Sequence, residues 1–256
     1  MLEFHELGHK YLNSINGEEY ISVTKVIEKL HESFDSESMA KKCSKNSKSK
    51  WYGMAPDKII RIWNSENKRS TELGHYYHKI QEDNAADANL KVFRSDVRQG
   101  VKYATNQILE EGLYVEHLIY HPTVNLCGQA DEVRVEDGYI HILDYKTSKE
   151  IKMKGFTPYN GKPKMLFYPV DHMEDCNYNH YTLQLSLYMY MILLHNPHLK
   201  PGKICIRHSI FNERLDQYGF PKTIFNEGVP SIKTLMWYWP EYHEKEVIKI
   251  INYLFN

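Results

Sequence analysis

Residues 128–148 read Gly128-Gln-Ala-Asp131-Glu-Val-Arg-Val-Glu-Asp137-Gly138-Tyr-Ile-His-Ile-Leu-Asp144-Tyr-Lys146-Thr-Ser148. The Asp137-Gly138 pair predicts a two-residue type I′ turn, because this turn needs a positive φ angle at both central positions. Apolar residues alternate with other residues on both sides of the pair, which predicts strands over residues 129–135 and 139–145. The segment therefore predicts a β-hairpin.

The turn also sets the register of this hairpin. Counting outward from it places Asp131 directly opposite Asp144, and opposite side chains share one face with Cβ atoms about 4.5–5.5 Å apart. Lys146 follows two residues later on the same face. That face is otherwise apolar, with Val133, Val135, Ile140 and Ile142. The hairpin thus brings two carboxylates and a lysine to the end of a core-facing stripe.

Adjacent carboxylates on a buried surface are unfavourable unless a cation or a shared proton neutralises them. A divalent metal ion relieves this repulsion, and oxygen ligands favour Mg²⁺ or Mn²⁺ over Zn²⁺. Lys146 can pair with an acid, or it can orient an attacking water and stabilise charge that develops on a phosphoryl group. The alternative is a surface hairpin that ends in an ordinary Asp–Lys ion pair.

Hydrophobic patterning predicts the remaining elements. We expect helices over residues 25–30, 57–63, 71–84, 94–111, 181–194 and 241–254. We expect further strands over residues 117–120 and 203–211, and a hairpin of residues 10–13 and 19–24 around Asn16-Gly17. This order predicts the α/β class, with a mixed central β-sheet flanked by helices. We expect one domain, with a hairpin and helical part at about 1–112, a sheet core at about 113–215 and a terminal helix at about 240–254.

Composition limits the class of protein. The 256 residues carry 32 Lys+Arg against 33 Asp+Glu, so the net charge of -1 identifies no partner. The mean hydropathy of -0.58, with no apolar run of about 20 residues, argues against a membrane-spanning protein. Without a visible secretory signal we expect an intracellular protein in the cytoplasm. We expect free, buried thiols at Cys43, Cys127, Cys176 and Cys205, which form no C-x-x-C pair.

These motifs resemble the PD-(D/E)XK nuclease superfamily. Gly128-Gln-Ala-Asp131 is similar to its Gly-x-x-Asp, and Asp144-Tyr-Lys146-Thr-Ser148 to the D-x-K-T-S of its RecB-like branch, which includes mitochondrial genome maintenance exonucleases. Gly74-His-Tyr-Tyr-His78 resembles the branch's helical G-x-x-x-H, and Gln184-Leu-Ser-Leu-Tyr188 its Q-x-x-x-Y. With His9-Lys-Tyr11 and Ser22-Val-Thr24 as the opening hairpin and helix, the resemblance covers about residues 9–211. It implies a restriction-endonuclease-like core.

The resemblance also implies roles for individual residues. The implied metal ligands are His78, Asp131, Asp144 and the main-chain carbonyl of Tyr145. Lys146 would act in catalysis together with the two aspartates. Supporting or DNA-binding roles would fall to Gln184, Tyr188, Glu82 and Glu116, and either glutamate could instead hold a partner of a metal ligand. The cluster-binding cysteines of some members have no counterpart, so we expect no iron–sulfur cluster.

The resulting expectation is a Mg²⁺- or Mn²⁺-dependent DNA exonuclease, with endonuclease action left open, that leaves 5′-phosphate and 3′-hydroxyl ends. The resemblance places it in DNA end processing for recombination, repair or replication. It is similar to phage-encoded members, which work in the host cytoplasm. DNA, single-stranded or with free ends, is the expected partner, and a helicase or recombinase would be a separate chain.

Two alternatives come from other classes of protein. A non-catalytic DNA-binding protein could share the fold. A zinc metalloprotease is suggested by His5-Glu6-Leu7-Gly8-His9, a literal H-E-x-x-H. That motif needs a stable helix, whereas here it contains a glycine and precedes a hairpin pattern. The basic run Lys41–Lys50 reads as a solvated loop or as a contact with a phosphate backbone.

Overall fold

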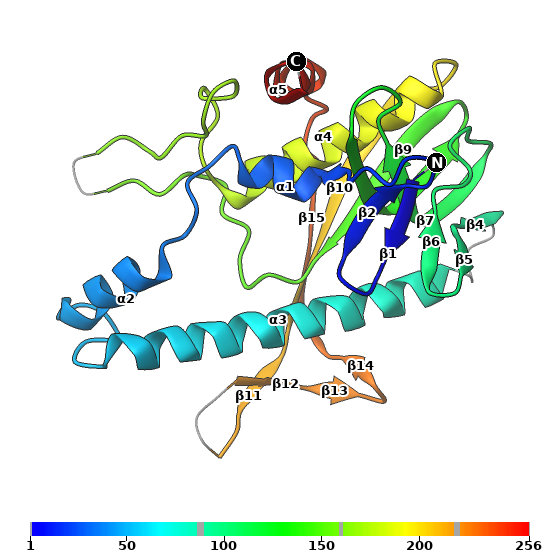
Figure 1. Ribbon diagram of the computed structural model, residues 1–256. Helices are drawn as coiled ribbons and strands as arrows, with labels where there is room; N and C mark the ends of the chain where they lie inside the picture. Colours follow the sequence, from blue (N-terminus) through cyan, green and yellow to red (C-terminus); the bar gives the residue numbers. More distant parts are fainter. Residues whose placement is uncertain (1, 86–89, 159–160, 218–220, 256) are drawn as a thin grey trace.

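The computed structural model describes residues 2–85, 90–158, 161–217 and 221–255 (Figure 1). Its helices are α1 (Val23–Glu28), α2 (Ser36–Lys45), α3 (Pro56–Asn84), α4 (Asn177–His195) and α5 (Glu244–Phe255). Its strands are β1 (Leu2–His5), β2 (Lys10–Asn13), β3 (Ile21–Ser22), β4 (Val92–Arg94), β5 (Asp96–Arg98), β6 (Val101–Tyr103), β7 (Gly112–Tyr120), β8 (Leu126–Glu136), β9 (Tyr139–Lys146), β10 (Lys200–Phe211), β11 (Glu213–Leu215), β12 (Pro221–Thr223), β13 (Phe225–Asn226), β14 (Val229–Pro230) and β15 (Ile232–Tyr238).

The predicted hairpin is present as β8 and β9. Asp137 and Gly138 have φ angles of 52° and 78°, as a type I′ turn requires. The strands pair from Glu136 with Tyr139 to Glu132 with Leu143. The predicted register is therefore confirmed.

The hairpin lies at the centre of a seven-stranded sheet. Its strand order is β15-β10-β9-β8-β7-β4, and β3 adds to the far end of β8. The pairs β9–β10, β4–β7 and β3–β8 are parallel and the others antiparallel. The chain returns from β9 to β10 through α4, since parallel neighbours need a long crossover. The expected mixed sheet flanked by helices is thus confirmed.

Helices cover the sheet in two different ways. Helices α1 and α5 both lie against α4 (Figure 1). Apolar side chains of these three helices pack with those of β8, β9 and β10 in one large core. Helix α3 instead crosses the sheet and packs Tyr77 against Tyr145 and Phe211. Adjacent side chains on a helix point about 100° apart, so the side chain of the next residue, His78, points away from this aromatic contact.

The N-terminal residues form a second, four-stranded sheet in the order β2-β1-β6-β5. His5 ends β1 and pairs with Lys10, and His9 lies in the connecting turn with a φ angle of 50°. The H-E-x-x-H residues therefore form a β-turn connection rather than the helix a zinc protease needs. The predicted hairpin around Asn16-Gly17 is reduced to a bridge between Leu12 and Glu19, because the following strand β3 pairs with β8 instead.

One helix prediction is wrong, and two others are incomplete. The expected helices 57–63 and 71–84 are both present, but they are joined in one helix, α3, in which Arg69 forms ion pairs at the polar middle. Its guanidinium lies 3.3 Å from Glu66 on the same helix and 2.8 Å from Glu213 on β11. The expected helix 94–111 is replaced by short strands, because Gln99 and Gly100 turn the chain at positive φ and β6 pairs with the distant β1.

Other differences concern less regular parts of the chain. The basic run Lys41–Lys50 begins inside α2, so only its second half is a loop. The strand β15 was not predicted. Three of the four free cysteines are buried as expected, whereas Cys43 is only half-buried. Within the described ranges, no helix is both long and apolar enough to cross a bilayer.

Candidate active site

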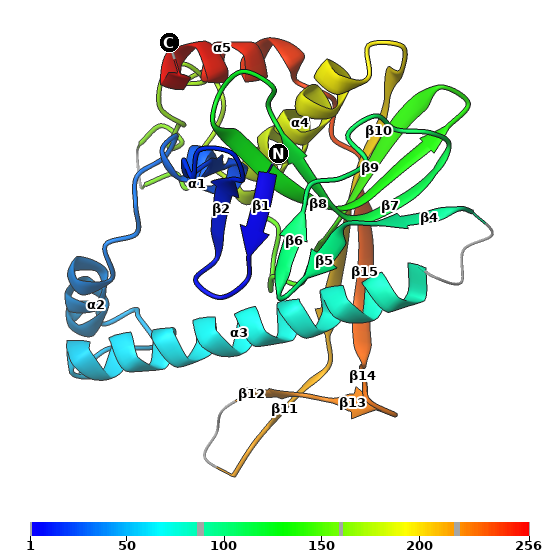
Figure 2. The same cartoon turned by 45° about the vertical axis from the view of Figure 1, so that its right-hand side comes forward.

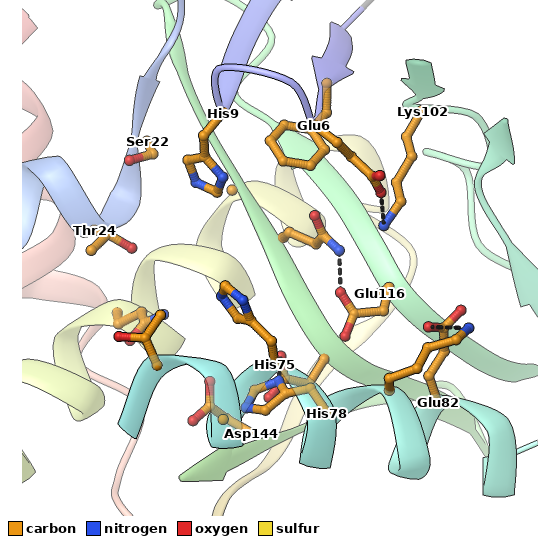
Figure 3. Close-up of a pocket in the computed structure, with 18 of the residues that line it drawn as sticks. Glu6, His9, Ser22, Thr24, His75, His78, Glu82, Lys102, Glu116 and Asp144 are labelled. Carbon is orange, nitrogen blue, oxygen red and sulfur yellow. Dashed lines mark hydrogen bonds and ion pairs between the residues drawn. The ribbon is translucent and has the colours of Figure 1, made fainter. Parts of the chain in front are cut away.

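A cavity of about 990 Å³ lies between α3, the N-terminal sheet and the open end of the β8–β9 hairpin (Figure 3). Side chains from all three regions and from α4 converge on it. Those that the sequence analysis had assigned to the site are His78, Glu82, Glu116, Asp131, Asp144, Lys146, Gln184 and Tyr188. The structure therefore brings every predicted site side chain to the wall of one cavity.

Three carboxylates lie on three adjacent strands. The pairs on either side of Glu116 and Asp131 put these residues opposite each other on β7 and β8. The β8–β9 pairing extends to Glu132 with Leu143, so the next residues outward from the turn, Asp131 and Asp144, lie beside each other. Glu116 has a φ angle of 49°, which is uncommon for a residue other than glycine. Backbone strain of this kind concentrates at functional sites, where the surrounding structure holds it.

His78 reaches these acids from helix α3. Its Nδ1 atom lies 3.2 Å from Asp131 Oδ1. One ligand atom each of His78, Glu116 and Asp131 lie within 4.8 Å of one another. An imidazole nitrogen and carboxylate oxygens at this separation can share a cation. Glu116 therefore belongs to the candidate ligand group, whereas the sequence analysis left its role open.

Lys146 forms the opposite side of the site. Its Nζ atom lies 2.6 Å from Asp144 Oδ2 and 4.7 Å from the centre of the Tyr181 ring. The Tyr145 N–H donates to Asp131 Oδ2 at 2.7 Å, which fixes the orientation of that carboxylate. The role of the Tyr145 carbonyl as a ligand stays a prediction.

The charges in the cavity do not balance. Burial raises the pKa of Asp144 to about 6, and Lys146 offsets this only in part. Burial and the charge of Asp131 raise the pKa of Glu116 to about 7. Burial is also the largest single effect on Asp131, but His78, Lys146 and the Tyr145 N–H together outweigh it and hold the pKa of Asp131 below its usual value. These acids compete for the positive charge of two side chains, so the donor set fits an additional cation.

The same electrostatics act on the two basic side chains. Burial would lower the pKa of His78, but Asp131 and Asp144 outweigh it and raise this pKa to about 9. Asp144 and Asp131 likewise overcome the burial of Lys146 and raise its pKa. Lys146 therefore carries a positive charge at neutral pH.

Gln184 and Tyr188 line the cavity from helix α4. Gln184 Nε2 donates to the Tyr188 hydroxyl at 3.0 Å, as their i, i+4 spacing on α4 allows. A Cβ atom at Gly128 would lie 2.3 Å from the Tyr188 ring. The glycine of the Gly-x-x-Asp motif is thus needed so that this ring can pack against β8.

Glu82 lies at the edge of the cavity. Its carboxylate is 2.9 Å from Arg94 Nη1 and 3.0 Å from Lys79 Nζ. Two cations thus already neutralise it. Of the two glutamates whose roles were left open, Glu116 lies near the candidate ligands His78 and Asp131, whereas Glu82 is paired with Arg94 and Lys79 at the cavity edge.

The sequence analysis did not assign several other side chains of the cavity to the site. These are His9, Ser22, Thr24, His75, Lys102 and Gln129. Gln129, whose Nε2 donates to Glu116 Oε2, had a signal, since it precedes Asp131 by two residues on one strand face. His75 also had a sequence signal, because it lies three residues before His78 and residues at this spacing share a helix face. His9 and Lys102 come from the N-terminal sheet, which no local pattern places beside the hairpin.

A second group of potential ligands lies away from this cavity, with His31, Asp175 and His180 within the same 4.8 Å limit. Its carboxylate is already satisfied, since Asp175 lies 2.9 Å from His180 Nε2 and 3.2 Å from Lys164 Nζ. The two imidazole rings stack with centroids 4.4 Å apart. Hydrogen bonding to His180 and the ion pair with Lys164 thus already occupy Asp175, and this group is the weaker candidate for a metal.

No protein-family model matches this sequence, and a search of curated proteins finds no match. The functional interpretation therefore depends on the chemistry of the cavity.

Proposed function

We propose that this protein is a Mg²⁺- or Mn²⁺-dependent deoxyribonuclease with a restriction-endonuclease-like core of the PD-(D/E)XK type. The observation that carries the proposal is the meeting of Asp131, Asp144 and Lys146 at the ends of two adjacent strands, in a cavity that His78 also enters. Burying these charges costs free energy. A protein that only binds DNA has no need of such a site, whereas a nuclease can use it to bind a metal ion and to stabilise charge on the phosphoryl group.

The residues for a metal ion are present. His78, Glu116, Asp131 and Asp144 would hold it, with the Tyr145 carbonyl as a further proposed ligand. These are oxygen ligands with one imidazole, a set that suits Mn²⁺ and Mg²⁺. A divalent cation bound there would polarise the scissile phosphoryl group and lower the pKa of water.

Lys146 supplies the remaining positive charge. Because its pKa is raised, it acts as a hydrogen-bond donor and not as a base. It can orient the attacking water and stabilise the negative charge that develops on the phosphoryl oxygens. Asp144 holds the ammonium group at the cavity through their 2.6 Å ion pair.

The proposed cellular role is DNA end processing in recombination, repair or replication. Exonuclease action is the favoured mode. A helicase or recombinase that works with this protein would be a separate chain.

The test is the cleavage of DNA labelled at the 5′ or the 3′ end, single- and double-stranded, in Mg²⁺ or Mn²⁺. Wild type is compared with Lys146→Ala and with Lys154→Ala, a matched variant of an exposed lysine in the loop after β9. We expect cleavage by wild type and by Lys154→Ala, its loss in Lys146→Ala and in EDTA, and products that give the polarity.

Other results point to the alternatives. If wild type binds DNA and leaves every substrate intact with both metals, the protein is a non-catalytic DNA-binding module. If Lys146→Ala cleaves as fast as wild type, the activity does not come from this cavity.

A further inference from the structure

Helix α2, the turns after it and the first half of α3 form an arm that extends away from the central sheet (Figures 1 and 2). Helix α2 packs on the N-terminal end of α3. Ala40 is buried in this contact, and Ser44 Oγ donates to the Met54 carbonyl at 2.6 Å. Both views place α2 and the β1–β2 hairpin on the same side of α3. The arm is thus an ordered continuation of one wall of the cavity.

The arm carries a dense positive charge. The run Lys41–Lys50 contains five lysines and no acidic residue, and all five side chains are exposed. Among the ion pairs of the described residues, none involves these lysines. Lys41, Lys42 and Lys45 share one exposed face of α2, as their i, i+3 and i, i+4 spacings require. Since the net charge of the whole chain is -1, this is a local patch.

An aromatic surface adjoins the lysines. Lys50 Nζ lies 4.6 Å from the centre of the Trp51 ring. The Trp51 ring is half-buried and rests edge-on against Trp63 of α3 at 6.2 Å. Lysines beside a supported aromatic ring are the combination that binds single-stranded nucleic acid, because the ring stacks with a base and the lysines hold phosphates.

One face of α3 connects the arm to the cavity. Asn64, Thr71 and His78 recur every seven residues, which is about two helical turns, so they share a face. The polar side chains of Thr71 and His75 line the cavity on this path. Pro56 and Thr71 are about 22 Å apart along the helix axis. For a strand with stacked bases, which rises 3.4 Å per nucleotide as in B-DNA, that length corresponds to about six nucleotides.

We propose that the arm is a second nucleic-acid-binding surface that holds the phosphate backbone of the substrate strand about six nucleotides from the cavity. The occupant is single-stranded DNA, which is favoured over an acidic protein by the continuity of the polar helix face with the proposed nuclease site. The identity of the polymer rests on the proposed function. Lys41, Lys42 and Lys45 contact phosphates, and Trp51 stacks with a base.

The experiment measures the binding of fluorescein-labelled (dT)24 and (dT)4 by anisotropy in EDTA. The test protein carries Lys41→Gln, Lys42→Gln and Lys45→Gln together. A matched control carries Lys245→Gln and Lys249→Gln, two exposed lysines on α5, at the other side of the molecule (Figure 1). All five positions are exposed, so both proteins should fold, which circular dichroism checks.

We expect the arm variant to bind (dT)24 roughly tenfold or more weakly at 0.1 M NaCl, with a salt dependence of log K reduced by about 2 for three lost phosphate contacts. Binding of (dT)4 should not change, because it is too short to span the cavity and the arm. The control should bind both oligonucleotides like wild type. In cleavage, the arm variant should show a raised KM for (dT)24 and an unchanged kcat.

Each opposite result overturns the proposal. If the arm variant binds (dT)24 as tightly as wild type, the arm is not a binding surface. The same conclusion follows if the α5 control weakens binding equally, or if wild type does not bind (dT)24. If wild type cleaves DNA while the arm variant binds normally, only the arm proposal fails. If the arm variant loses affinity and wild type never cleaves, only the nuclease proposal fails.

Discussion

His78 Nδ1 on helix α3 lies 3.2 Å from Asp131 Oδ1 on strand β8. This contact joins a helix to the central hairpin and brings an imidazole to three carboxylates. It also raises the pKa of His78 and lowers that of Asp131. In the proposed nuclease, a metal ion would replace the proton that now links the two side chains.

The first prediction concerns metal affinity. Replacing His78 by Gln removes a proposed ligand, so His78→Gln should weaken Mn²⁺ binding at least about tenfold, since even outer partners of metal ligands contribute that much. Isothermal titration calorimetry measures the effect. His75→Gln, one turn earlier on the same helix, is the control and should bind Mn²⁺ like wild type. Unchanged affinity in His78→Gln would remove this residue from the ligand set.

The second prediction concerns the proton on His78. A histidine must be neutral to bind a metal, and the pKa of His78 without metal is about 9. Mn²⁺ binding at pH 7.5 should therefore release about one proton, and the affinity should rise as the pH approaches 9. Calorimetry in buffers of different ionisation enthalpy counts the protons. The His78→Gln protein should release fewer; an equal count would mean that another group supplies them.

The third prediction concerns the fit of Gly128 to Tyr188. Because a Cβ atom would meet the ring at 2.3 Å, Gly128→Ala should lower the free energy of unfolding by about 1–3 kcal/mol through overpacking. Gly74→Ala is the contrast, since its Cβ would lie 3.4 Å from Thr147 Oγ1 and alanine favours a helix. That variant should be neutral or more stable by up to about 1 kcal/mol. Urea denaturation compares the two, and equal effects would contradict the packing argument.

The fourth prediction concerns acid stability. Burial lowers the pKa of His117 to about 4, against about 6.5 in the unfolded chain. Between these values the unfolded state binds more protons, so the free energy of unfolding falls as the pH falls. The protonation of His117 in the unfolded chain lowers the free energy of unfolding by about 3 kcal/mol at pH 4, relative to neutral pH. Stability curves from pH 4 to 7.5 should therefore be flatter for His117→Gln than for wild type. The exposed His198→Gln is the control, and parallel curves for all three proteins would refute the assignment.

Local features of the chain were predictable where neighbouring residues determine them. The Asp137-Gly138 turn needs only its own φ angles, and it positions Asp131 and Asp144 through the strict period of a strand. Helix α4 was predictable for a similar reason, since it is long, apolar and free of breakers. The contact between Gln184 and Tyr188 on α4 is local for the same reason, since residues at i and i+4 of a helix are neighbours.

Other features depend on partners far away in the chain. Residues 92–94 and 101–103 are strands because β7 and β1 offer them backbone partners, which hydrophobic periodicity does not report. The polar middle of α3 stays helical with the help of the ion pair between Arg69 and Glu213. Interactions of this range are decided by the packing of the whole chain.

The amino-acid sequence by itself determined the hairpin, its register and the placing of Asp131, Asp144 and Lys146 on one face, because turn geometry and strand alternation are local properties. Only the tertiary structure decided that Glu116 and His78 would join them. Glu116 joins them because β7 pairs with β8 in the register that places it opposite Asp131. His78 joins them because α3 packs Tyr77 against Tyr145 and Phe211 of the sheet. A site assembled from separate elements is a property of their packing, and no single segment encodes it.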